Sequence, residues 1–321
     1  MDKLSPAVLD TFGLSNRGIK KEKGHYLCNS VAGPVKVHIS NHAPEAIRLQ
    51  HSIKEHLAES FPHTDRFRLT GDGSAYIMIG REIYVASFHP NPQRETDLEN
   101  EADVLGAISA LAKLHTASAR MPLSLPKSPS LTEIYNRKLS DLAQASKQAR
   151  RGSRMSDFDV AFIKHAPRAT NTIKEALGHL EKTSYLRLYQ QSIEHGSLCH
   201  NALKEENLPI IGGTTFIINF SYAASDLQLS DLAAFIRRYA QRSIRSIPVS
   251  RILSIYDNIC PLSSGARDVI YPQLIFPWSF TKLASQYYSK KRNWTPNGLI
   301  NSMENVLAEW DGYEEYIKEI L

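Results

Sequence analysis

The chain has 321 residues, 42% of them hydrophobic and 22% charged, which favours one or two folded domains and excludes a disordered chain. The formal charge of +5 permits an anionic partner without demanding one, and the one basic cluster, Lys147 to Arg154, fits a solvated helix end better than a nucleic-acid surface. Three cysteines without a Cys-x-x-Cys pair exclude a disulfide framework and a zinc ribbon, and no run is apolar enough to span a membrane. We therefore expect a soluble protein made in a cytoplasm, with no membrane span and no nucleic-acid partner.

The first 88 residues combine short strands with two helices. Alternating apolar residues and Gly- or Pro-containing turns predict strands, whereas apolar residues three and four apart predict helices. The predicted strands cover residues 19–21, 25–31, 35–39, 66–70, 75–79 and 82–88, and the predicted helices cover 4–12 and 46–57. This order describes a small α+β lobe, residues 1–88.

The remainder, residues 89–321, is mainly helical. Apolar residues at helical spacing run from Val104 to His115, where Asp97 or Asn100 can cap the start. Further helices are expected at 131–148, 156–165, 172–180, 186–192, 232–238, 252–258, 280–290 and 300–320. The two prolines between Phe88 and Gln93 mark the boundary between the lobes, and a cleft between two lobes is the default place for a ligand.

A stretch from His195 to Arg238 interrupts the helices with a polar loop, a strand predicted at 215–218, a second loop and a helix. His200 is expected to brace the first loop by hydrogen bonds, and Asp231 to open the helix. Twelve histidines invite metal hypotheses, but no His-Glu-x-x-His motif is present. We expect packing or surface histidines and no metal site.

Several short motifs follow one another in an order that points to a known family. They are Arg94 to Asn100, Leu111 to Ser118 (LAKLHTAS), Ser156 to Asp159 (SDFD), Leu198 to His200 (LCH), Ser230 to Ala233 (SDLA), Tyr271 to Pro277, the pair Tyr287 and Tyr288, and Trp294. With these motifs the chain resembles the CotS family of spore coat proteins, in the aminoglycoside phosphotransferase and choline kinase-like superfamily.

The resemblance implies a bilobal protein kinase-like fold, with a small antiparallel-sheet N-lobe and a larger, mainly helical C-lobe. It also implies an endospore-forming bacterium, synthesis in the mother-cell cytoplasm and deposition in the spore coat, where other coat proteins would be the partners. A nucleotide or another small molecule in the interlobe cleft is a further expected ligand.

Members that transfer phosphate keep aspartates at three positions of the central stretch. Here these positions hold Ala202 in place of the catalytic aspartate, and Asn219 and Ser221 in an Asn-Phe-Ser sequence where Asp-Phe-Asp is expected. Asn207 is retained at the metal-binding asparagine position. A methyl group cannot orient an attacking hydroxyl, and neutral oxygens bind Mg²⁺ weakly. We therefore expect a degenerate site with no catalytic residue and no bound cofactor.

Two questions stay open at this point. Lys36 stands where a phosphate-steadying lysine would lie and is equally an exposed strand lysine, and its carboxylate partner would be Glu45 or Glu55. Lys36, Asn207 and Asn219 would together form a vestigial ATP and Mg²⁺ cleft, as in a pseudokinase that binds a nucleotide without catalysing a reaction. An active ATP-dependent small-molecule phosphotransferase remains the alternative, with Glu205, Glu206 and Asp226 as the candidates for relocated carboxylates.

Overall fold

The computed structural model describes residues 4–22, 24–89, 93–151, 155–242, 246–289 and 296–317. The chain forms two compact units, residues 1–126 with 195–225, and residues 127–194 with 226–321. They do not coincide with the lobes predicted on either side of residue 88, a division that stays a prediction. Arg154, Trp294 and residues 90–92 of the predicted boundary lie outside the described residues.

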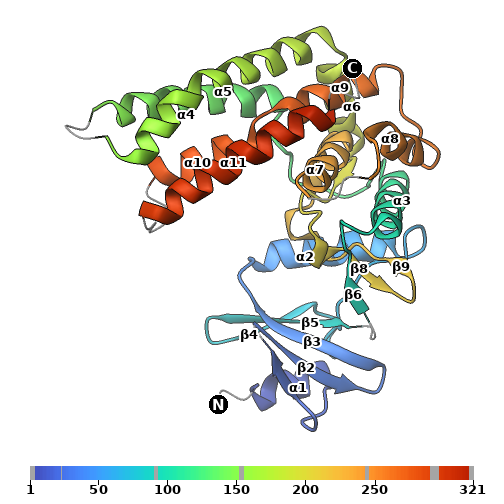
Figure 1. Cartoon of the computed structure of the whole chain (residues 1–321). Helices are drawn as coiled ribbons and strands as arrows, with labels where there is room; N and C mark the ends of the chain where they lie inside the picture. The colour runs from blue at the N-terminus through green and yellow to red at the C-terminus, as the bar shows by residue number, and fades with distance from the viewer. Residues whose placement is uncertain are drawn as a thin grey trace. The chain divides into compact units, whose positions relative to one another are not determined.

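A five-stranded antiparallel sheet opens the first unit (Figure 1). In spatial order its strands are β1 (Lys20–Glu22), β2 (His25–Ser30), β3 (Gly33–Ser40), β5 (Glu82–Phe88) and β4 (Tyr76–Ile79). Val35 and Val37 of β3 are fully buried beneath helix α1 (Pro6–Phe12), so alternate residues, Lys36 and His38, face the other side of the sheet. The strands predicted here are confirmed within one or two residues, with one exception.

The exception is the strand predicted at 66–70, which is wrong. Only Phe67 bridges the sheet, to Ser87. The hydroxyl of Thr70 bonds Asp72 and accepts from the backbone N–H of Ser74 at 2.8 Å, so the chain turns instead of extending a ladder. The segment follows helix α2 (Pro44–Leu57), which begins at its proline as expected.

The first unit also contains helix α3 (Glu101–Ala117), with Asn100 as its cap, and two small sheets that the sequence did not predict. One pairs β6 (Gln93–Glu95) with β8 (Pro209–Ile211) and β9 (Thr214–Thr215), and the other pairs β7 (Leu198–Cys199) with β10 (Ala224–Ser225). The strand predicted at 215–218 is wrong beyond Thr215. The backbone N–H groups of residues 216 and 218 bond the carbonyls of Pro209 and Asn207, whereas that of residue 217 bonds His63, and no regular strand continues past Thr215.

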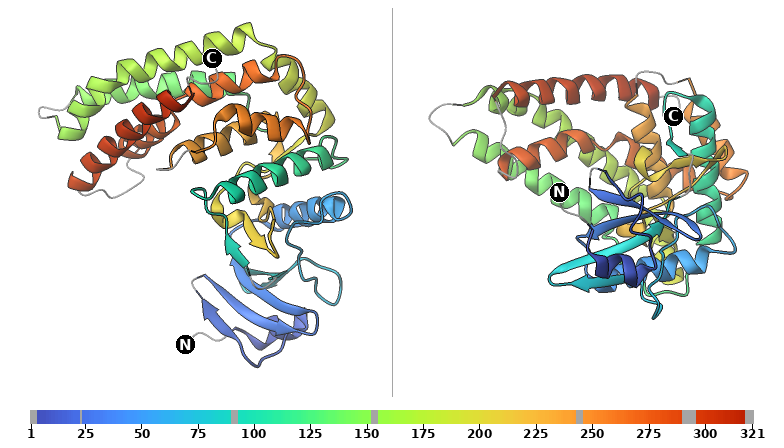
Figure 2. Two further views of the ribbon diagram at one scale, coloured as in Figure 1. Left: turned by 45° about the vertical axis from the view of Figure 1, so that its right-hand side comes forward. Right: turned by 90° about the horizontal axis from the view of Figure 1, so that it is seen from below.

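The second unit consists of helices in the part of the chain that the structure describes. They are α4 (Leu131–Ala149), α5 (Asp157–Lys182), α6 (Tyr185–His195), α7 (Leu229–Ala240), α8 (Val249–Asp257), α9 (Ala266–Ile275), α10 (Trp278–Tyr288) and α11 (Pro296–Ile317). Figure 2 shows α4, α5, α10 and α11 running beside one another. The helices predicted at 156–165 and 172–180 are one helix, α5, which continues through Pro167 from a capping box of Ser156 and Asp159.

Helix α7 begins earlier than expected, at Leu229, so Asp231 lies in its first turn and does not precede it. The order of elements is that of an α+β protein. Among the described helices, none combines the length and apolar character that crossing a membrane would require.

Candidate functional site

The loop and strand end singled out from the sequence lie together in the first unit. Asn201 and Asn219 are the described non-glycine residues with positive φ angles, 59° and 66°. This left-handed conformation suits asparagine better than most residues because its short side chain bonds locally. Each asparagine reverses the chain direction, Asn201 after β7 and Asn219 before the short 3₁₀ helix η2 (Phe220–Tyr222).

His200 joins these two turns. Its side chain is completely buried, its Nε2 lies 2.9 Å from the carbonyl oxygen of Ile218, and its Nδ1 accepts the backbone N–H of Ala202 at 3.3 Å. The ring also meets Phe220 edge-on, with centroids 5.0 Å apart. His200 therefore braces the loop, as the sequence suggested, and both of its ring nitrogens are engaged.

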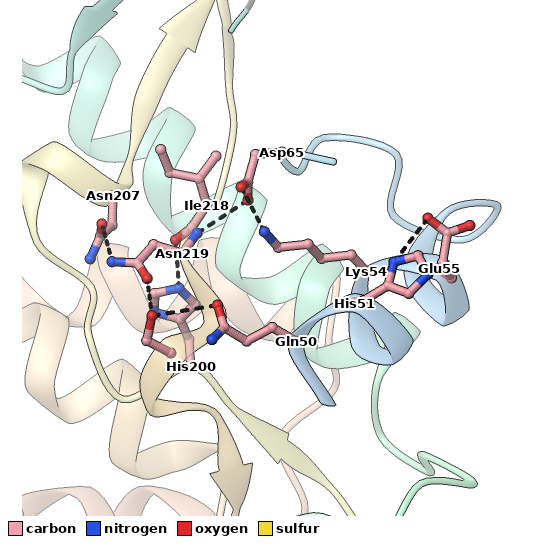
Figure 3. A network of polar contacts seen from close by, with 10 residues as sticks. Gln50, His51, Lys54, Glu55, Asp65, His200, Asn207, Ile218 and Asn219 are labelled. Carbon is pink, nitrogen blue, oxygen red and sulfur yellow. Dashed lines mark hydrogen bonds and ion pairs between the residues drawn. The ribbon is translucent and has the colours of Figure 1, made fainter. Parts of the chain in front are cut away.

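A chain of neutral hydrogen bonds connects the degenerate positions, and Figure 3 shows the part of it that joins Asn207 and Asn219. Asn207 Nδ2 donates to the carbonyl of Ala202 at 2.8 Å, and Asn219 Nδ2 donates to Asn207 Oδ1 at 3.2 Å. The hydroxyl of Ser221 donates to Asn219 Oδ1 and lies 3.5 Å from Gln50 Oε1. The two amide oxygens that would bind a metal ion thus accept hydrogen bonds from within the site.

A buried ion pair adjoins this chain of amides. Lys54 of α2, whose side chain is 1% exposed, donates to Asp65 Oδ2 at 2.6 Å, and its Nζ lies 3.9 Å from the centroid of the Phe67 ring. The other carboxylate oxygen of Asp65 accepts the backbone N–H of Asn219 at 3.2 Å. Figure 3 shows Asp65 between the lysine and the turn at Asn219, so this carboxylate is balanced by a cation and used by the backbone.

The residues present do not fit a catalytic Mg²⁺ ion. Ala202, Asn219 and Ser221 carry no charge, and the one carboxylate bonded to Asn219 is paired with Lys54. Hard cations prefer several anionic oxygens, and Mg²⁺ gives up its water only for strong ligands. Within the described ranges, no three His, Cys, Asp or Glu side chains gather to hold a metal ion.

Lys36 does not pair with either carboxylate proposed for it. Glu45 lies 2.8 Å from Arg48, and Glu55 lies 3.9 Å from His51. Lys36 instead contributes to the environment of His38, two residues along the same strand. Burial, followed by the charge of Lys36, lowers the pKa of His38 to about 4, so this imidazole is neutral at pH 7.

The proposed relocated carboxylates are engaged elsewhere. Glu206 is exposed and lies 3.7 Å from Lys204 Nζ, and Glu205 begins the 3₁₀ helix η1 (Glu205–Asn207). Asp226 belongs to the second unit, where the backbone N–H of Leu227 donates to it at 2.7 Å and burial raises its pKa to about 7.

Gln50, Lys54 and Asp65 were missed from the sequence. A signal was available for two of them, because positions 47, 50, 53, 54 and 57 form the core-facing stripe of α2, and two of the five are polar. Polar residues at core positions must find partners. Nothing local in the sequence indicates that Asp65 is the partner.

Comparison with known proteins places the chain in a family. The model of the family described as spore coat putative kinase YutH matches residues 10–320. The chain belongs to this family. The resemblance to a family of spore coat proteins is therefore confirmed.

Relatives of known sequence and structure agree with this assignment. Spore coat protein S of Bacillus subtilis (strain 168) is 24% identical over 166 residues, which is 51% of this chain and 47% of that protein, so the match spans about half of the relative's length. The aminoglycoside phosphotransferase of Alicyclobacillus acidocaldarius subsp. acidocaldarius has a TM-score of 0.86 at 16% identity, over 100% of this chain and 96% of the other.

A spectinomycin phosphotransferase in complex with ADP and spectinomycin has a TM-score of 0.61 at 14% identity, over 96% of this chain and 97% of the other. These likenesses confirm the predicted α+β, bilobal kinase-like fold. At such low identity they carry no conclusion about activity.

Proposed function

We propose that this member of the family is a non-catalytic structural or interaction protein of the spore coat. It would be made in the mother-cell cytoplasm and laid down on the forespore with other coat proteins. The observation that carries the proposal is the hydrogen-bonded chain from Ala202 through Asn207 and Asn219 to Ser221. It fills the place of the phosphotransfer groups with neutral, mutually satisfied side chains.

The physical argument concerns charge. Phosphoryl transfer requires a base or orienting carboxylate for the acceptor hydroxyl and anionic ligands that keep Mg²⁺ on the phosphates. In this chain the position of the orienting carboxylate holds the methyl group of Ala202. The nearby carboxylate of Asp65 is paired with Lys54 at 2.6 Å. Freeing Asp65 for a metal ion would leave a buried ammonium group without its partner, which costs about 3–5 kcal/mol.

The test is nucleotide binding and turnover with the full-length protein. Calorimetry with ATP, with and without Mg²⁺, should show no magnesium-dependent binding, and no ADP should form with a panel of hydroxylated and amino substrates. Magnesium-dependent binding together with turnover would contradict the proposal. Imaging of a fluorescent fusion in a sporulating host addresses the coat role separately, since a fusion that stays in the mother-cell cytoplasm would contradict it.

A companion variant tests whether the missing carboxylates are the reason that ATP does not bind. Ala202→Asp, Asn219→Asp and Ser221→Asp together restore the missing carboxylates within the same scaffold. We expect this variant to gain magnesium-dependent ATP binding relative to the native chain, because three anionic groups then surround Asn207. The same measurement on Glu206→Gln, an exposed change outside the network, serves as the matched control.

A further inference from the structure

A small cavity in the second unit brings together a guanidinium group and two unsatisfied hydrogen-bond donors. It has a volume of about 40 Å³ and lies among helices α7, α10 and α11 and the end of α9. Its polar lining includes Arg237, Trp278 and Tyr313, and its rim carries Gln241 and Glu309, both exposed. This cavity plays no part in the function proposed above.

Arg237 is a partly buried cation that has no counter-charge among the described residues. Its guanidinium donates to the carbonyl of Gln273 at 3.0 Å and lies 5.1 Å from the centroid of the Trp278 ring, and no carboxylate of the described residues pairs with it. Burial lowers the pKa of Arg237, yet an arginine stays protonated in proteins. The group has five N–H donors, of which the structure shows one bonded to a protein acceptor, so the guanidinium can still bind an anion.

Two further donors in the cavity have no partner. The indole Nε1 of Trp278 and the hydroxyl of Tyr313 are both buried and make no hydrogen bond within the described structure. Buried polar groups are nearly always satisfied, so two orphans in one cavity with an unpaired cation need an explanation. An indole N–H can only donate, and it therefore requires an acceptor.

Glu309 does not supply the missing negative charge. Partial burial raises the pKa of its carboxyl group, whereas a guanidinium in contact would lower it. Water could satisfy the indole and the hydroxyl but not the charge of Arg237. The occupant that meets all three requirements is a small oxyanion.

We propose that this cavity binds the carboxylate group of a ligand, with Arg237, Trp278 Nε1 and Tyr313 Oη as the donors. A volume of about 40 Å³ has room for a group of about three non-hydrogen atoms, since on the same measure one water molecule needs roughly 10–15 Å³. A carboxylate is planar and accepts paired N–H groups from a guanidinium, with lone pairs left for two more donors. The remainder of the bound ligand extends out of the cavity past Gln241 and Glu309.

The experiment uses the full-length protein and the probes sodium formate, sodium acetate and inorganic phosphate, at an ionic strength held constant with chloride. The chain has three tryptophans, so the indole N–H signal of Trp278 in a ¹⁵N-correlated spectrum can be assigned with Trp278→Phe. We expect formate or acetate to shift this signal saturably, with a dissociation constant of about 1–10 mM for so small a ligand. No shift up to about 100 mM, or tighter binding of phosphate than of either carboxylate, overturns the proposal.

Variants separate binding from folding. Tyr313→Phe removes one unpaired donor and keeps the ring, and Trp278→Phe removes the other and keeps a smaller aromatic ring. The protein should fold in both cases, and calorimetry should show affinity for acetate falling at least about tenfold. Arg237→Leu should abolish binding. Tyr189→Phe is the matched control, because that hydroxyl already donates to Ser128 at 2.7 Å and lies outside the cavity lining. Unchanged affinity in Tyr313→Phe, or an equal loss in Tyr189→Phe, overturns the assignment.

Discussion

Lys54 and Asp65 form the ion pair that adjoins the neutral candidate site. Lys54 occupies a core-facing position of α2, where an amine is tolerated because Asp65 and the face of Phe67 surround it. The same carboxylate holds the backbone of Asn219. One ion pair therefore anchors both helix α2 and the turn that carries the degenerate metal position.

Removal of the carboxylate should be costly. We expect Asp65→Ala to lower the free energy of unfolding by about 3–5 kcal/mol, because it leaves the Lys54 ammonium buried and unpaired. Urea denaturation followed by circular dichroism measures this change. Glu45→Ala removes the exposed partner of Arg48 on the same helix and should cost less than about 1 kcal/mol. Equal losses in the two variants would contradict the role given to Lys54 and Asp65.

A double variant tests whether the unpaired charge causes the loss of stability. Replacement of both partners, Lys54→Met with Asp65→Leu, should cost less than Asp65→Ala alone, since no unpaired charge remains. A double variant that is less stable than Asp65→Ala would contradict the cost assigned to the unpaired Lys54 ammonium group, because the bond to Asn219 is lost in both variants.

At the scale of elements, the site depends on how short segments end. The segment before Asn219 uses its three backbone N–H groups to bond Asn207 and Pro209 on one side and His63 on the other, so it joins two parts of the first unit. Gly196 performs a related task where helix α6 passes into strand β7. Its φ is +66°, and a Cβ atom would lie 2.8 Å from the carbonyl oxygen of Met121.

This close approach predicts a difference between two glycines. Gly80 has a similar φ of +62° but open space around it. Gly80→Ala should therefore cost about 1–2 kcal/mol from the left-handed backbone alone. Gly196→Ala should cost at least about 1 kcal/mol more, because backbone must also move. Chemical denaturation of both variants makes the comparison, and equal costs would show that the contact with Met121 relaxes freely.

At the scale of the whole molecule, the chain passes repeatedly between two compact units. Each unit contains its own buried core, and the sites described above each belong to one unit. The three cysteines are free, with Cys28 and Cys199 buried in the first unit and Cys260 partly exposed in the second. They are independent reporters of the two units.

Thiol labelling should therefore distinguish the cysteines. In the native protein, a thiol reagent should react quickly with Cys260 alone, because the other two are covered and burial raises the pKa of the Cys28 thiol. All three should react in denaturant, and reductant should not change the number of reactive groups. Fast native labelling of Cys28 or Cys199, located by peptide mass spectrometry, would contradict the packing described for the first unit.

Local patterns predicted most of the architecture. The alternation of β3 and the caps of α3 and α5 were readable because strand and helix periods and capping residues act over a few positions. The errors at 66–70 and 215–218 arise because strand pairing depends on distant parts of the chain. In both segments the alternation is genuine, but pairing stops after the single bridge of Phe67 to Ser87 in the first segment and at Thr215 in the second. How far a ladder extends depends on the neighbouring strand, which no local pattern reveals.

The sequence by itself determined that carboxylates are absent at Ala202, Asn219 and Ser221, and it determined the family, because both depend on residue identity along one line of chain. The tertiary structure alone decided that Lys54 and Asp65 complete that site, and that Arg237, Trp278 and Tyr313 share a cavity. The physical reason is that charge pairing and cavity lining are through-space properties. Residues 76 positions apart, such as Arg237 and Tyr313, come together only when helices pack, and no spacing rule connects them.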